Sequence, residues 1–209
     1  YKEWKGPFYP EKLPNKDMLA YYSSELPAVE INNTFYRLPK REVIENWAAQ
    51  VPEGFRFSIK ASRRITHFRR LKDTGEVLDY LIEATSVLGD RLGVILFQLP
   101  PNFKKDIDRL GAFLETLPED VRAAFEFRND SWFDDEVYDA LRAHSAALVT
   151  ADTNEKDADI VSTATFGYLR LRKDGYSDKK IATWAKKVAE QKWDEAFVFF
   201  KHEDAGGGP

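Results

Sequence analysis

Short apolar runs alternate along the chain with longer segments in which apolar residues recur every three or four positions. The short runs are rich in β-branched and aromatic residues, and they predict strands at residues 28–35, 55–61, 93–99, 123–128, 147–152, 166–172 and 196–202. The longer segments predict helices at residues 16–25, 42–49, 76–88, 106–117, 134–144 and 177–191, with Ser131 and Ser177 as N-caps. Strands that alternate with helices, without hairpin turns, indicate parallel strands joined by crossovers.

Polar residues on these strands distinguish an open sheet from a barrel. An open sheet with helices on both faces requires strands that are apolar almost throughout. Here charged and amide side chains instead recur at every second position near the carboxyl ends of three strands, as Glu30 and Asn32, Glu126 and Arg128, and Arg170 and Arg172. Such side chains suit the interior of a barrel that opens into a site at its C-terminal mouth. We therefore expect one domain, residues 1–209, with the α/β fold of a TIM-type (β/α)₈ barrel.

The strand count predicts an incomplete barrel. Seven strands are visible where eight are needed, and barrels of this class usually take about 250 residues. The predicted elements begin with a helix and end with a strand. We therefore expect the first strand and the last helix to be missing; these two elements are neighbours in a closed barrel.

Composition and charge narrow the chemistry. The chain has no cysteine, which excludes disulfides, thiolate catalysis and cysteine-ligated metals. Its net charge of −4 provides no overall attraction to nucleic acid or to acidic membranes. No apolar run approaches the roughly 18 residues of a membrane span, and no signal sequence opens the chain, so we expect a cytoplasmic protein without a membrane partner. P-loop, GxGxxG and GxSxG motifs are absent, so nucleotide-binding and serine-hydrolase functions have no support, and the cofactor stays unknown.

Two glutamates are the main catalytic candidates. Glu30 and Glu126 lie on different strands and should both point into the mouth, where an unpaired carboxylate costs several kcal/mol. They are therefore either used as general acid and base or held in a buried network that fixes strand register. Substrate-binding candidates are the cations and polar groups at strand ends and in the adjoining loop, namely Asn32, Lys60, Arg70, Gln98, Arg128, Asp152 and Arg170.

The loop after the second predicted strand is strongly basic. Residues 63–72 carry Arg63, Arg64, Arg69 and Arg70 without an acidic residue. This loop predicts binding of a phosphate or carboxylate, with a polynucleotide or a merely solvated face as alternatives. His67 lies in the same loop and is a third catalytic candidate, as an acid/base group or as a residue that orients the loop.

A metal site is a weaker hypothesis. His202, Glu203 and Asp204 follow the last predicted strand and could form an oxygen and nitrogen site with Asp152 and Glu126. No spacing typical of metal ligands appears, so we assign no metal ligand. The function that these residues favour is acid/base chemistry on a small anionic or polyhydroxylated substrate, by a hydrolase, lyase or isomerase. The alternatives are a non-catalytic module that binds nucleic acid or anions through residues 63–72, and a phosphodiester hydrolase dependent on a divalent metal.

Six segments carry a family resemblance: residues 1–10 (YKEWKGPFYP), 29–38 (VEINNTFYRL), 57–72 (FSIKASRRITHFRRLK), 96–101 (LFQLPP), 125–133 (FEFRNDSWF) and 199–204 (FFKHED). Together they resemble the YecE-like family, also known as domain of unknown function 72. The resemblance implies a TIM barrel without an established activity, a first strand ahead of Tyr1 and a closing helix after Pro209. Many members carry His-Gly where this chain has Arg172 and Lys173, so the resemblance implies a more basic rim here.

Overall fold

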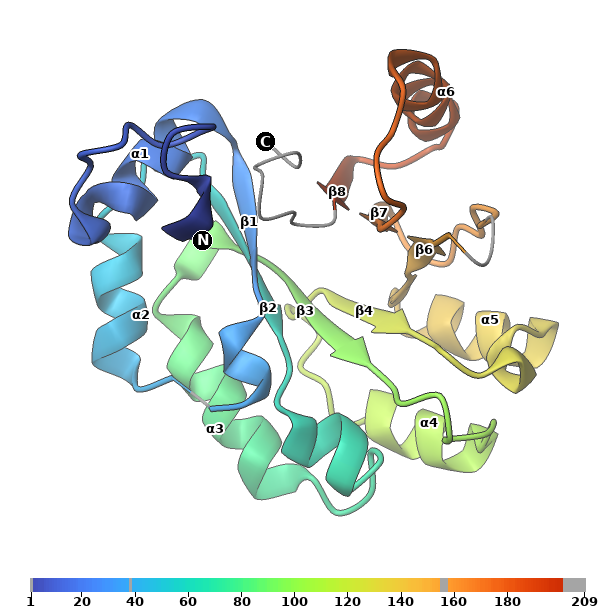
Figure 1. Ribbon diagram of the computed structural model, residues 1–209. Coiled ribbons are helices and arrows are strands. Elements are labelled where there is room, and N and C mark those ends of the chain that lie inside the picture. Colours follow the sequence, from blue (N-terminus) through green and yellow to red (C-terminus); the bar gives the residue numbers. More distant parts are fainter. Residues whose placement is uncertain (1, 38, 155–157, 201–209) are drawn as a thin grey trace.

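The computed structural model describes residues 2–37, 39–154 and 158–200, and these residues form an α/β fold (Figure 1). Five parallel strands form one sheet in chain order: β1 (Ala28–Ile31), β2 (Arg56–Lys60), β3 (Leu92–Gln98), β4 (Ala123–Glu126) and β5 (Ala147–Leu148). A second parallel sheet holds β6 (Thr150–Asp152), β7 (Phe166–Leu171) and β8 (Glu195–Phe200). The predicted strand at residues 147–152 is thus divided at Val149 between the two sheets.

In the described part of the chain, six α-helices connect or flank the strands: α1 (Met18–Glu25), α2 (Arg41–Ala48), α3 (Gly75–Ser86), α4 (Ile107–Leu114), α5 (Asp135–Ala143) and α6 (Asp178–Ala189). Short helical turns lie at η1 (Lys2–Trp4), η2 (Asn15–Asp17), η3 (Asn33–Phe35), η4 (Arg64–Phe68), η5 (Gly89–Arg91) and η6 (Asp130–Trp132). Ser177 caps α6 as predicted, by accepting a hydrogen bond from the Lys180 amide. The prediction for Ser131 was wrong, because the side chain of Asp134 caps α5.

The core has two layers, and the alternation of side chains along β3 separates them. Ile95 and Phe97 face outward and pack against helices α2 to α5, which cover that face of the five-stranded sheet (Figure 1). Val94 and Leu96 face inward, where they pack with residues of the other sheet such as Tyr168. The next inward position on β3 is occupied by Gln98, so the polar site begins where the inner apolar layer ends.

The two sheets are not closed into one barrel. Among the described residues no hydrogen-bonded ladder joins β1 to β8, and a cleft of about 510 Å³ lies between these edges. Its walls include Trp4 and Tyr22 on one side and Phe197 and Val198 on the other. The parallel α/β fold is therefore confirmed, whereas a closed TIM-type barrel is not what the described residues form.

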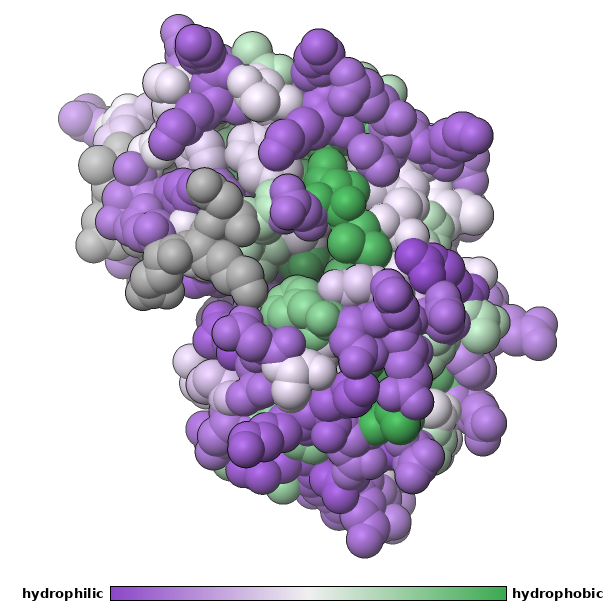
Figure 2. Space-filling model, turned by 90° about the vertical axis from the view of Figure 1, so that its right-hand side faces the viewer, coloured by the Kyte–Doolittle hydropathy of each residue, from purple (hydrophilic) through white to green (hydrophobic). Residues whose placement is uncertain are grey.

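The face that carries α6 is loosely packed. None of the residues of α6 is buried, and Ile181, Val198 and Phe200 all remain more than a third exposed. Figure 2 shows apolar surface in the hollow between the upper and lower parts of this face. Gly167 is an exception to this loose packing, because the ring of Trp193 lies over it and would come within 2.2 Å of an added Cβ atom.

Candidate functional site

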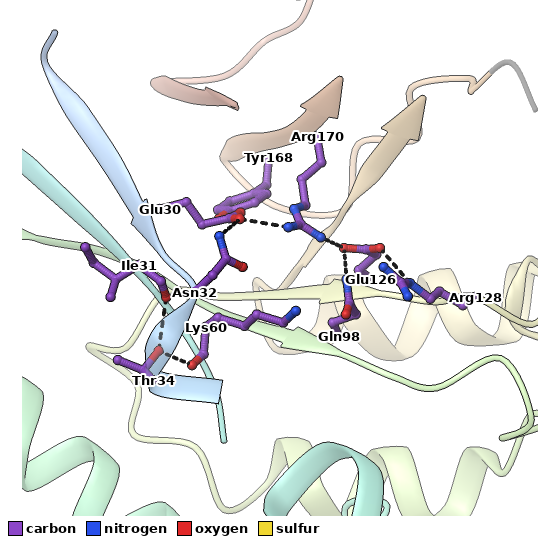
Figure 3. Close-up of polar contacts among 10 residues, drawn as sticks. All are labelled: Glu30, Ile31, Asn32, Thr34, Lys60, Gln98, Glu126, Arg128, Tyr168 and Arg170. Carbon is purple, nitrogen blue, oxygen red and sulfur yellow. Dashed lines mark hydrogen bonds and ion pairs between the residues drawn. The ribbon is translucent and has the colours of Figure 1, made fainter. Parts of the chain in front are cut away.

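A guanidinium bridge between two carboxylates forms the centre of the site (Figure 3). Arg170 on β7 donates from Nη2 to Glu30 Oε1 at 2.8 Å and from Nη1 to Glu126 Oε2 at 2.5 Å. All three side chains are at most 7% exposed. Burial lowers the pKa of Arg170, but the two carboxylates outweigh it and raise the pKa above its ordinary value. The bridge joins the two sheets, because β1 and β4 carry the glutamates.

Both oxygens of Glu126 are fully engaged. Gln98 lies beside Glu126 in the β3–β4 register and donates from Nε2 to Oε2 at 2.8 Å. Arg128 Nε donates to Oε1 at 3.2 Å. Burial raises the pKa of Glu126, but the charges of Arg170 and Arg128 and the hydrogen bond from Gln98 bring it down to about 2. Glu126 is therefore a carboxylate throughout the neutral range.

Glu30 is bonded through both oxygens as well. Asn32 donates from Nδ2 to Oε1 at 3.0 Å, and the Tyr168 hydroxyl donates to Oε2 at 2.7 Å. Burial and the charge of Glu30 raise the pKa of Tyr168 well above its usual range, so the phenol stays protonated. Sequence reasoning missed Tyr168, although it precedes Arg170 by two residues and must therefore share its face of β7.

Lys60 ends β2 and extends toward the same cluster (Figure 3). Its Nζ lies 4.4 Å from the centre of the Phe35 ring, and its backbone carbonyl accepts a 2.6 Å hydrogen bond from Thr34. Burial lowers the pKa of Lys60, Arg170 and Arg128 lower it further, and the two glutamates only partly compensate, which leaves it at about 8. Thr34 and Phe35 position Lys60. The sequence pattern gives no signal for these two residues, except that they follow a strand.

His67 also contacts Phe35, the residue whose ring lies beside Lys60. Its ring contacts Phe35 edge-on, with 4.8 Å between centroids, and Nδ1 is 2.9 Å from the Thr66 hydroxyl. Burial lowers the pKa of His67, and the cations Lys60, Arg128 and Arg70 lower it further. The imidazole is therefore neutral at pH 7.

The basic loop forms an arginine and aromatic rim beside the site. The guanidinium of Arg63 lies 5.6 Å from the ring centre of Tyr36 and 5.2 Å from that of Phe68, and both rings are about two-thirds exposed. The loop contains a π-helical turn, η4, and then non-glycine residues with positive φ at Arg70 and Leu71. Such backbone is costly and is frequent at functional sites.

Asp152 lies apart from the carboxylate cluster. Its neighbours Val149 and Ala151 belong to the inner apolar layer, so alternation along β6 turns Asp152 to the opposite face. There it pairs with Lys173 Nζ at 3.1 Å and accepts a 2.9 Å hydrogen bond from the Tyr176 hydroxyl. The structure thus brings together Glu30, Asn32, Lys60, His67, Arg70, Gln98, Glu126, Arg128 and Arg170, and it places Asp152 elsewhere.

The aromatic side chains near the site divide between rim and core. Trp132 is fully buried, stacks on Phe127 and donates to the Phe103 carbonyl at 2.7 Å, so it belongs to the core. Tyr36 instead lies at the rim. The proposed metal ligands His202, Glu203 and Asp204 lie outside the described residues. Within the described part of the chain, no three histidine or acidic side chains gather closely enough to hold a metal ion.

Chemically, the cluster combines fixed charges with two groups whose protons can move near neutral pH. Glu126 and Arg170 keep their charges, whereas Lys60 loses its proton near pH 8 and His67 is already neutral. Arg172 adds a further cation, and burial followed by the charge of Arg170 lowers its pKa. Cations therefore outnumber the two carboxylates, which favours an anionic ligand.

None of the helices in the described part of the chain is long and apolar enough to cross a membrane. The structure resembles a DUF72 family protein from Thermotoga maritima MSB8, with a TM-score of 0.86, 26% identity, and coverage of 100% of this chain and 91% of that chain. A DUF72 family protein from Enterococcus faecalis V583 shares the fold at a TM-score of 0.76 and 22% identity, over 91% of this chain and 83% of that chain.

Curated relatives point to the same family. The UPF0759 protein YunF of Bacillus subtilis (strain 168) is 32% identical over 139 residues, which are 63% of this chain and 49% of that protein. The UPF0759 protein YecE of Escherichia coli (strain K12) is 32% identical over 116 residues, or 55% of this chain and 43% of that protein. The matches therefore span about half the length of these relatives. A family model described as "Protein of unknown function DUF72" matches residues 1–209, and the chain belongs to this family.

Proposed function

We propose that the chain binds a small anionic substrate at the carboxyl ends of its strands and performs acid/base chemistry on it. The observation that carries the proposal is the excess of cations around two carboxylates that are already fully bonded. Arg170 is shared by Glu30 and Glu126, while Arg128 is about two-fifths exposed and can turn toward a ligand. A guanidinium at such a position binds a carboxylate or phosphate through two parallel hydrogen bonds.

In this proposal the roles of the glutamates change. Glu126 holds the guanidinium groups of Arg128 and Arg170 in place, because a carboxylate with a pKa of about 2 does not donate a proton at pH 7. Lys60 and His67 are the groups that exchange protons with the substrate. The pKa of Lys60 is about 8, close to neutral pH, and the lowered pKa of His67 leaves its imidazole neutral and able to accept a proton. The polar groups of Gln98 and Asn32 orient the carboxylates.

Anion binding is tested by titrating the protein calorimetrically with inorganic phosphate, citrate and, as a neutral polyol, glycerol. We expect the anions to bind, and we expect Arg128→Gln to weaken binding by about tenfold, the loss of one charge-assisted pair. The matched control is Arg142→Gln, which removes an exposed cation that pairs with Asp139 at 2.7 Å. Equal binding by both variants, or no anion binding at all, would overturn the proposal.

A nucleic-acid module is the second candidate, and the rim supports it. Stacking of bases on exposed aromatic rings beside arginines is a common way to bind single strands. Binding of a fluorescent oligothymidylate should then fall steeply with salt and weaken in Phe68→Ala. Salt-independent binding, or binding that Phe68→Ala leaves unchanged, would exclude this role.

We also propose that the two sheets are the two parts of a TIM-type barrel. The support is the parallel order of every strand, the shared inner apolar layer and the position of the polar cluster at carboxyl strand ends. The open edges of β1 and β8 would be joined by one more strand.

A further inference from the structure

Among the described residues, no carboxylate forms an ion pair with Nζ of Lys60, and no acceptor receives a hydrogen bond from it. This Nζ lies 4.4 Å from the centre of the Phe35 ring. The four oxygens of Glu30 and Glu126 are occupied by other donors, with Arg170 bonded to both residues. The cluster thus holds an amine close to two carboxylates without pairing it.

This arrangement favours the neutral, nucleophilic form of the amine. With a pKa of about 8, about one-tenth of Lys60 is unprotonated at pH 7, against about one in three thousand for a lysine at 10.5. A lysine that binds an anion by its charge would instead need to stay protonated at pH 7. Arg128 and Arg170 already supply the positive charge, and a desolvated lysine beside other cations is the known way to activate an amine toward carbonyl groups.

We propose that Lys60 forms an imine with the carbonyl group of an anionic keto or aldehyde substrate; the inference rests on the anion-binding function proposed above. Nζ attacks the carbonyl carbon, and a proton passes from the nitrogen to the carbonyl oxygen to give a carbinolamine. The nitrogen then gives up its second proton and the carbinolamine hydroxyl takes up a proton, so that the carbon–oxygen bond breaks and water leaves. Amine and carbonyl thus become imine and water without any oxidant or reductant. The anionic group of the substrate lies against Arg128.

His67 is placed to carry the proton. Its ring and the Lys60 amine contact the same phenyl ring of Phe35, at 4.8 Å and 4.4 Å, and its neutral imidazole accepts the proton that the attacking nitrogen loses. Tyr168 stays protonated and bonded to Glu30, so it keeps that carboxylate from approaching the amine.

The test uses the intact chain, pyruvate as an anionic keto probe and acetone as a neutral one. Borohydride reduces an imine to a stable secondary amine, which peptide mass spectrometry locates. At pH 7 the neutral fraction of Lys60 is about 300 times that of a lysine at 10.5, so we expect pyruvate to label Lys60 at least about a hundredfold faster than such a lysine. We expect acetone to show little preference, and the labelling rate of Lys60 to reach half its maximum near pH 8.

Two variants separate the possible failures. Lys60→Arg keeps the charge and should abolish the mapped adduct while phosphate still binds; Lys105→Arg, at a surface lysine paired with Asp134, is the matched control and should be labelled like the wild type. Pyruvate adducts spread evenly over surface lysines, with phosphate binding intact, would refute the imine and leave the anion site standing. If the wild type shows neither a preferred adduct at Lys60 nor phosphate binding, the proposed function is refuted as well.

Discussion

Replacing Arg170 by methionine should strongly destabilise the fold. The substitution leaves Glu30 and Glu126 buried without their shared cation, and breaking a buried ion pair on one side costs about 3–5 kcal/mol. Small domains are stable by only about 5–15 kcal/mol, so the variant should fold but unfold at a much lower urea concentration.

The pH dependence of stability gives an independent value for the contribution of Glu126 to the free energy of unfolding. The pKa of Glu126 falls from 4.5 in the unfolded chain to about 2 in the fold, which corresponds to about 3 kcal/mol. Because the folded pKa is the lower one, this stabilisation is complete above pH 4.5 and is lost as the pH falls toward 2. In Arg170→Met the pKa of Glu126 rises, and this part of the acid sensitivity should shrink.

The assay is urea unfolding followed by circular dichroism at pH 7 and pH 3. A variant that also neutralises the carboxylates, Arg170→Met with Glu30→Gln and Glu126→Gln, should recover most of the loss, because no buried charge remains unpaired. The reasoning is refuted if Arg170→Met lies within about 1 kcal/mol of the wild type at pH 7, or if the triple variant is less stable than the single one.

Further substitutions test packing, capping and charge burial. Gly167→Ala should lower the free energy of unfolding by about 1–3 kcal/mol, because the new Cβ would strike Trp193. Gly111→Ala should raise it by about 0.5–1 kcal/mol, because there is open space beside this position in α4. Melting temperatures that shift in opposite directions would confirm both. Asp134→Ala removes the N-cap of α5 and should cost about 1 kcal/mol in urea unfolding, and an unchanged midpoint would contradict the cap. Lys60→Met should stabilise the fold at pH 7 by at most about 3 kcal/mol, reduced by the partial exposure of Lys60. Because the folded pKa of about 8 lies below the unfolded 10.5, that gain should disappear as unfolding is measured from pH 8 up to pH 10.5.

Local periodicity predicted the elements and the inward direction of most site residues. Gln98 and Glu126 are adjacent in the structure because each is the inward residue that closes its strand, which the alternation along residues 92–98 and 123–126 already indicates. Asp152 shows the limit of this reasoning. A position at a strand end does not decide the direction of the side chain; Val149 and Ala151 face the inner apolar layer, so alternation turns Asp152 to the opposite face.

Contacts between distant segments could not be predicted in the same way. The pairing of Arg170 with Glu30 spans 140 residues and depends on how the two sheets meet, which no local pattern specifies. The lowered pKa of Lys60 depends on that same meeting, because its causes are burial and then the charge of Arg170 on the opposite sheet. Sequence reasoning could supply the list of charged residues but not the partners that decide their protonation.

The charge cluster is more than a means of joining the sheets. Arg170 connects β7 to β1 and β4, yet an apolar trio of similar volume would join them without the cost of removing three charges from water. Stability alone therefore does not account for Glu30, Glu126 and Arg170. If the cluster serves a ligand, the triple variant that neutralises it should unfold near the wild-type urea concentration and still fail to bind phosphate. If the triple variant binds phosphate like the wild type, the cluster is structural, and the anion site must be built from the remaining arginines, such as Arg128.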